Sequence, residues 1–188
     1  MCNLACIDFG RKVLREKEIM GKAVIDVGAR NINGSLRPIV EAFKPASYLG
    51  VDIQTGPGVD LICDAEDLLI QFGTESFDLL ISTELLEHVK DWRKVITNFK
   101  QILKPNGVLV VTTRSKGFPC HDYPHDYWRY KLQDMQYIFS DFKIEYLEND
   151  PVEPGVFVKA KKPAGFKEND LSSYTLYSVR SGQIVVDT

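Results

Sequence analysis

Four carboxylates follow apolar segments of the sequence, each at the point where a buried strand is expected to end. Asp26 follows AVI, Asp52 follows YLGV, Asp64 follows DLIC and Glu84 follows FDLLIST. In an open parallel sheet, ligands bind outside the carboxyl ends of the strands. We therefore expect the four acids to share one rim of a sheet and to face one binding site.

Three of these acids have a candidate role in binding a ligand that contains a nucleoside and an ammonium group. Asp52 follows the second strand, where an acid can accept both hydroxyls of a ribose. Asp64 either accepts an exocyclic amine, such as adenine N6, or caps the helix that begins at Ala65. Asp26 is expected to balance an ammonium group, because a buried acid without a cation is costly.

The turn after the first strand reads DVGARNINGS and lacks the G-x-G-x-x-G pattern of loops that bind a pyrophosphate. Gly28 allows close backbone approach or a positive φ. Ala29 is small, and Asn31 and Gly34 both tolerate left-handed conformations. This loop suits a ligand that has a nucleoside but no phosphate.

A second group of reactive side chains lies in the segment GFPCHDYPHDYWRY. It contains His121 and His125, which are suitable general bases near neutral pH. Arg129 could bind a phosphate or carboxylate of an acceptor, and Trp128 either contacts the acceptor or packs the loop onto the sheet. His88, in LEHV, either faces the same site or anchors the turn before the next helix.

Strands alternate with helices over the first 113 residues, which predicts a parallel α/β sheet. The later part predicts two antiparallel neighbouring strands and a hairpin or edge strand in SSYTLYSV. We expect a single domain over 1–188, with a leading helix over 4–20 and a C-terminal extension over 163–188. The other expected strands are 22–27, 48–53, 60–64, 77–83, 107–113, 143–148 and 156–160, and the other helices are 34–43, 65–72, 91–103 and 131–140.

The composition narrows the class of protein. The net charge of −3 argues against a nucleic-acid partner, which usually requires a basic surface. The sequence has neither an apolar run of the roughly 18 residues that a membrane span needs nor a signal-peptide pattern, so cytoplasmic location is expected. The four cysteines do not have zinc-site spacing, and no metal site is expected.

Four stretches in this order resemble the class I S-adenosylmethionine-dependent methyltransferases, type 11 branch: VIDVGARNINGSLRP, YLGVDIQTGPGVDLICDAEDL, FDLLISTELLEHVKDW and LKPNGVLVVTT. A narrower similarity, carried by NGSLRP, GPGVD and H-x-YPHDYWR, is to members associated with glycan and sugar modification. The chain departs from the usual pattern in the first loop, which lacks G-x-G. It also has Asn106 where glycine is common, and asparagine can adopt the same turn geometry.

The resemblance implies a Rossmann-like three-layer α/β sandwich whose seven-stranded, mostly parallel sheet has the order 3-2-1-4-5-7-6, with strand seven antiparallel. It implies S-adenosyl-L-methionine as cofactor and a small-molecule or sugar acceptor. The implied cofactor-binding residues are Asp26, Gly28, Ala29, Asp52, Ile53, Asp64, Ala65 and Glu84.

An oxygen acceptor is the first choice, because the sequence has STEL after the fourth strand and not the N/D-P-P-Y/F motif of methyltransferases that act on planar amino groups. The candidate bases are His121, His125 and His88. Two alternatives stay open: a non-catalytic partner protein that binds the adenosyl cofactor, and a nucleotide-dependent oxidoreductase of similar fold. The tail after Pro163 either covers the pocket or pairs with another subunit, so a homodimer also stays open.

Overall fold

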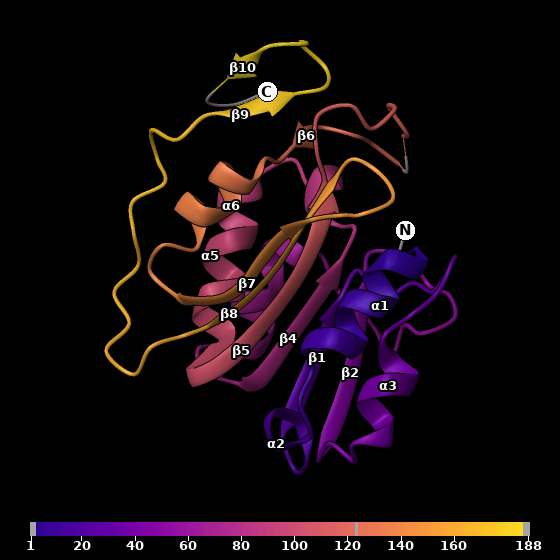
Figure 1. Cartoon of the computed structure of the whole chain (residues 1–188). Helices are drawn as coiled ribbons and strands as arrows, with labels where there is room; N and C mark the ends of the chain where they lie inside the picture. The colour runs from indigo at the N-terminus through magenta and orange to yellow at the C-terminus, as the bar shows by residue number, and fades with distance from the viewer. Residues whose placement is uncertain (1–2, 123, 186–188) are drawn as a thin grey trace.

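The computed structural model describes residues 3–122 and 124–185, and its centre is one seven-stranded sheet (Figure 1). The sheet contains β1 (Ala23–Val27), β2 (Ser47–Asp52), β3 (Leu61–Ile62), β4 (Phe77–Thr83), β5 (Leu103–Arg114), β7 (Lys143–Asn149) and β8 (Gly155–Lys161). Its order is β3-β2-β1-β4-β5-β8-β7, and β8 is antiparallel to both β5 and β7. β6 is not part of this sheet, so β7 and β8 are its sixth and seventh strands. The sheet therefore has the predicted order 3-2-1-4-5-7-6, with the seventh strand antiparallel.

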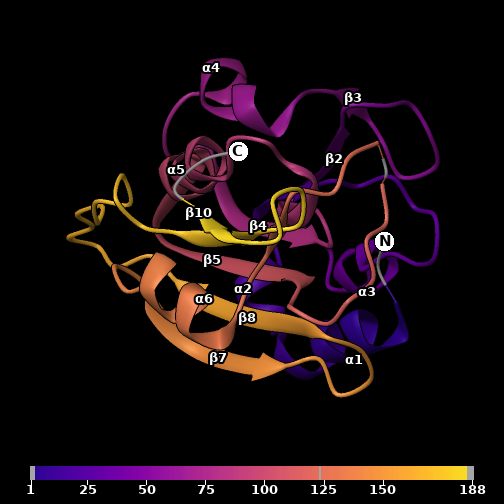
Figure 2. The same ribbon diagram turned by 90° about the horizontal axis from the view of Figure 1, so that it is seen from above.

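Helices cover both faces of the sheet and make three layers (Figure 2). On one face, α1 (Leu4–Val13) and α3 (Arg37–Ala42) pack over apolar side chains such as Val24 and Ile81. On the other face lie α4 (Leu68–Phe72), α5 (Trp92–Ile102) and α6 (Leu132–Ile138). The central strands are apolar on both faces because each face is covered.

Helix α5 shows how the sequence directs one of these layers. The side chain of Asp91 caps its first turn by accepting a hydrogen bond from the backbone N–H of Lys94 at 3.0 Å. Val95, Ile96 and Phe99 recur at helical spacing and are fully buried against the sheet. The predicted helix over 91–103 is confirmed to within one residue at each end.

The leading helix predicted over 4–20 is wrong as one continuous element. It is two helices, α1 and α2 (Glu16–Ile19), because Leu14 and Arg15 are extended. The ammonium of the buried Lys159 donates to the carbonyl oxygen of Val13 at 2.9 Å and to the carboxylate of Glu18. A break between the helices brings both acceptors to this buried cation, which would otherwise be costly.

Other predicted elements are shorter or differently assigned. The predicted helix over 65–72 begins as a 3-10 turn, η1 (Ala65–Asp67), and continues as α4. The KPNG turn lies inside the span of β5, where Asn106 has φ +65°, so asparagine does adopt the left-handed geometry. Within the described residues, no helix has the length and apolarity needed to cross a membrane.

A second, three-stranded sheet lies above the carboxyl ends of the main strands (Figure 1). It joins β6 (Trp128–Arg129) to β9 (Leu176–Ser178) and β10 (Ile184–Val185). The sequence predicts a hairpin or an edge strand in SSYTLYSV. This segment contains β9, which forms an antiparallel hairpin with β10 and is the central strand of this sheet, not an edge strand. β6 lies in a segment predicted to be a loop.

Candidate functional site

All eight residues expected to bind the cofactor line one pocket at the carboxyl ends of β1, β2 and β4. Its volume is about 260 Å³. Two of the three candidate histidines, His88 and His125, also line it, and His121 does not. The strand-end acids therefore come together at one rim, as the alternation of strands and helices predicts.

Asp26 is a buried acid with only one of its oxygens engaged. The hydroxyl of Tyr48 donates to Oδ2 at 2.6 Å, whereas Oδ1 has no hydrogen-bond partner among the described residues. Burial raises the pKa of Asp26 to about 6, despite the opposing effects of Tyr48 and Arg37. A cation brought into the pocket would stabilise the ionised form of this acid.

Asp52 and Asp64 both hold the backbone of the pocket wall. The carboxylate of Asp52 accepts from the backbone N–H of Arg30 at 3.2 Å and of Gln54 at 3.0 Å. Asp64 accepts from the backbone N–H of Glu66 at 2.9 Å and thereby caps η1, which is the alternative role expected for it. Both side chains still reach the pocket surface, so capping and ligand binding are compatible.

The first loop, which lacks G-x-G, packs closely against the loop that follows β2. Gly28 has φ +81°, and its N–H and that of Ala29 both donate to the carbonyl oxygen of Val51. A Cβ on Gly58 would lie 2.6 Å from the carbonyl oxygen of Ala29, and a Cβ on Gly50 would overlap the carbonyl oxygen of Gly58. The close backbone approach that requires glycine is thus between these two loops.

Glu84 lines the pocket from a left-handed backbone, with φ +56°. Its buried carboxylate forms an ion pair with Arg114 and lies 3.6 Å from Sγ of Cys6. Burial and the nearby Glu87 hold the pKa of Glu84 well above its usual range. A non-glycine residue at positive φ is uncommon and indicates that the surrounding contacts fix this position.

The candidate histidines occupy three different environments. His88 belongs to η2 (Leu86–His88), and its Nδ1 donates to the carbonyl oxygen of His125 at 2.5 Å. His121 lies edge-on to His88, with ring centroids 4.8 Å apart, and its Nδ1 donates to Asp126 at 3.1 Å. His125 is exposed at the pocket edge, where its Nδ1 lies 3.2 Å from the guanidinium of Arg180.

The prediction that Arg129 binds an acceptor is wrong. Arg129 is 2% exposed, and its guanidinium donates to both oxygens of Asp126, at 2.6 Å for the Nη2–Oδ2 pair. Hydrogen bonds from Arg129 and His121 hold the pKa of Asp126 well below its usual range against the effect of burial. Trp128 is fully buried and donates to the carbonyl oxygen of Val89 at 3.0 Å, so it packs the loop.

Three residues of this region were not found from the sequence. Glu87 is fully buried beside His88. The sequence feature that could have indicated this is an acid placed among the apolar residues of LLEHV. The hydroxyl of Tyr48 donates a hydrogen bond to Asp26. From the sequence alone, Tyr48 is only an aromatic residue in a predicted strand. The guanidinium carbon of Arg180 lies over the ring of Tyr127, 4.4 Å from its centroid. Arg180 belongs to the C-terminal tail, whose polar sequence has no periodicity from which its position could be predicted.

Comparison with known proteins agrees with this geometry. A family described as "methyltransferase domain" matches residues 5–148. A curated relative, the ubiquinone biosynthesis O-methyltransferase of Idiomarina loihiensis, is 29% identical over 112 residues, which are 53% of this chain and 45% of the relative. The chain thus spans about half the length of the curated relatives that it matches.

Two solved structures share the fold. The S-adenosylmethionine-dependent methyltransferase of Mesorhizobium loti superposes with a TM-score of 0.64 at 19% identity, over 84% of this chain and 98% of that one. The 1,6-didemethyltoxoflavin-N1-methyltransferase of Burkholderia thailandensis, solved with S-adenosylhomocysteine, gives 0.69 at 14% identity, over 86% and 79%. Since the family match covers most of the sequence, this chain belongs to the methyltransferase-domain family and has the fold of its S-adenosylmethionine-dependent members.

Proposed function

We propose that the protein transfers the methyl group of S-adenosylmethionine to an oxygen atom of a small-molecule acceptor, with a sugar hydroxyl as the preferred candidate. The observation that carries this proposal is the pocket in which Asp26, Asp52 and Asp64 meet at the rim of a methyltransferase-family sheet. The name of the O-methyltransferase relative supports an oxygen atom as acceptor. The preference for a sugar hydroxyl rests on the sequence resemblance to sugar-modifying members alone.

The residues present fit this cofactor. The free Oδ1 of the buried Asp26 is suited to the ammonium group of its methionine part. Asp52 can accept the ribose hydroxyls, and Asp64 can accept the adenine amine beside Ala65. When bound, S-adenosylmethionine supplies a sulfonium methyl group for in-line displacement.

An acceptor hydroxyl must also lose its proton, and His88 is the best placed of the three histidines to take it. Its Nδ1 donates to a carbonyl oxygen, which leaves Nε2 as the basic nitrogen of the neutral ring. His125 is less suited because it is exposed at the pocket edge and its Nδ1 is already in contact with the guanidinium of Arg180. We therefore assign proton removal to His88, with the ring of His121 edge-on to it.

Calorimetry and a transfer assay test the proposal together. We expect binding of S-adenosylmethionine and of its demethylated product but not of NAD, which separates the proposal from an oxidoreductase. We also expect label from methyl-labelled S-adenosylmethionine to appear on a member of a panel of sugars and phenols. Cofactor binding without transfer to any member would favour the non-catalytic partner, and absence of cofactor binding would overturn both.

Cofactor affinity is expected to depend on pH through Asp26. The pKa of about 6 means that this acid is largely protonated at pH 5 in the free protein and ionised above pH 7. Because the ionised form attracts the cofactor ammonium, the affinity should be about tenfold weaker at pH 5 than above pH 7. Calorimetric titrations from pH 5 to 8 measure this.

The control for this pH dependence is Asp26→Asn, which keeps an oxygen for the Tyr48 hydroxyl. This variant should bind the cofactor more weakly and show no slope between pH 5 and 7. A slope that persists in Asp26→Asn would assign the titration to a histidine and contradict the role given to Asp26.

A further inference from the structure

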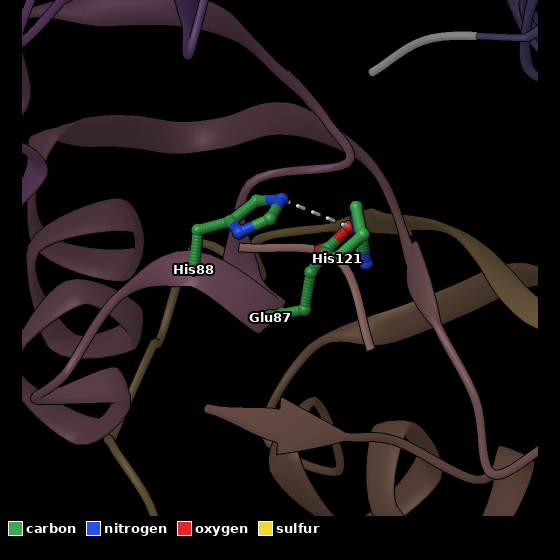
Figure 3. Close-up of side chains that lie close together, drawn as sticks. All are labelled: Glu87, His88 and His121. Carbon is green, nitrogen blue, oxygen red and sulfur yellow. Dashed lines mark ion pairs between the residues drawn. The ribbon is translucent and has the colours of Figure 1, made fainter. Parts of the chain in front are cut away.

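A carboxylate and two imidazoles meet beside the cofactor pocket (Figure 3). Glu87, His88 and His121 each offer one ligand atom, and these atoms lie within 4.8 Å of one another. Glu87 and His88 come from η2, whereas His121 comes from the loop after β5. This Glu87–His88–His121 cluster brings together the side-chain types that bind Zn²⁺ and other divalent first-row metals.

Glu87 points an unsatisfied oxygen into the cluster. Its side chain is fully buried, and its Oε2 accepts from the hydroxyl of Thr113 at 2.9 Å. Its Oε1 has no hydrogen-bond partner within the described part of the chain and lies 3.8 Å from Nε2 of His88. A buried carboxylate oxygen without a partner is costly and calls for a cation or a donor at this place.

Both histidines are held in the tautomer that a metal requires. The Nδ1 of His88 donates to a backbone carbonyl oxygen, and the Nδ1 of His121 donates to the Asp126 carboxylate, which Arg129 in turn fixes. Nε2 of each ring therefore carries the lone pair. Metal-binding histidines usually have their other ring nitrogen anchored in this way, to a carboxylate or a backbone carbonyl.

We propose that Glu87, His88 and His121 bind one divalent first-row cation, with Zn²⁺ as the best match, and that this cation binds the oxygen of the methyl acceptor. Three protein ligands leave a coordination position open, which is the arrangement of catalytic zinc sites. His88 lines the cofactor pocket, so the cluster adjoins the pocket wall. Glu84 is not a ligand, because Arg114 and Cys6 surround its carboxylate.

This inference rests on the proposed function for what the cation does, but not for whether it binds. A bound cation lowers the pKa of a coordinated hydroxyl, so the acceptor releases its proton to water. The acceptor oxygen then forms its bond to the methyl carbon as the carbon–sulfur bond breaks, and the sulfur keeps the electron pair. In this state His88 is a ligand and no longer the base.

The test uses the full chain, first stripped of metal with a chelator and then titrated with Zn²⁺ by calorimetry and with Co²⁺ by visible absorption. We expect one equivalent of either ion and Co²⁺ bands typical of nitrogen and oxygen ligands. His121→Gln removes a partly exposed ligand and should weaken Co²⁺ binding at least about tenfold, since even the loss of a ligand's hydrogen-bond partner has that effect. His125→Gln, which changes the histidine outside the cluster, should bind Co²⁺ as the wild type does.

The outcomes separate this inference from the proposed function. The metal site is overturned if the wild type takes up no stoichiometric Zn²⁺ or Co²⁺, or if His121→Gln binds Co²⁺ as tightly as the wild type. Neither result overturns the proposed function, because binding of S-adenosylmethionine is measured separately on the same proteins and His88 is then the base. Metal binding without cofactor binding would instead remove the proposed function and leave the metal site.

Discussion

Replacing Asp52 with alanine is expected to weaken the binding of S-adenosylmethionine by at least about 100-fold. Hydrogen bonds to a charged group contribute about 1.5–3 kcal/mol each, and the carboxylate of Asp52 is placed to receive two from a ribose. The same carboxylate holds the backbone N–H groups of Arg30 and Gln54, so both walls of the pocket would loosen. Calorimetry with the cofactor and with its demethylated product measures the loss.

Two further variants make the Asp52 result specific. Asp52→Asn keeps the size of the side chain and one acceptor oxygen, and it should give an intermediate loss of affinity. Asp67→Asn changes an exposed acid of η1 that does not line the pocket and should leave the affinity unchanged. An Asp52→Ala protein that stays folded and binds the cofactor within about threefold of the wild type would contradict the assignment.

Replacing Trp128 with alanine is expected to lower the free energy of unfolding by about 3–5 kcal/mol, as for other buried aromatic residues. Trp128 is fully buried, and its indole N–H donates to the carbonyl oxygens of Val89 and Lys90, between η2 and α5. The cavity left behind would lie beneath the loop that carries His121 and His125. Urea denaturation followed by circular dichroism measures the change in unfolding free energy.

Trp128→Phe is the matched control because it keeps a buried aromatic ring while it removes the indole N–H and a smaller part of the apolar contact. It should cost less, about 1–3 kcal/mol, which is the penalty for leaving a buried acceptor unpaired. If Trp128→Ala lost less than about 1 kcal/mol, the residue would not be part of the packed core, and a direct contact with the acceptor would become the better interpretation.

The sheet and the rim of the pocket could be predicted because they depend on local patterns. Short apolar runs separated by amphipathic helices lead to one parallel arrangement, and the carboxyl ends of its strands must then lie together. Asp26, Asp52 and Glu84 each come directly after such a run, which places them without any knowledge of the loops.

The remaining features depend on contacts between residues far apart in the sequence. The break after α1 is associated with the ammonium of Lys159, which lies 146 positions beyond the Val13 carbonyl that it binds. Arg180 reaches His125 because β9 pairs with β6, and these strands are too short to show a periodicity of their own. The positions of His121 and His125 likewise follow from hydrogen bonds within an irregular loop.

The steric interlock between the loop after β1 and the loop after β2 means that the two segments form a single unit for exchange between proteins. A chimera that receives only residues 28–34 from a protein with larger side chains there would place new atoms against Gly58, where even an added Cβ would lie 2.6 Å from the carbonyl oxygen of Ala29. A chimera that receives 28–34 together with 50–60 would bring its own matching surfaces. Recombination of this pocket with related enzymes should therefore cut the chain outside both segments.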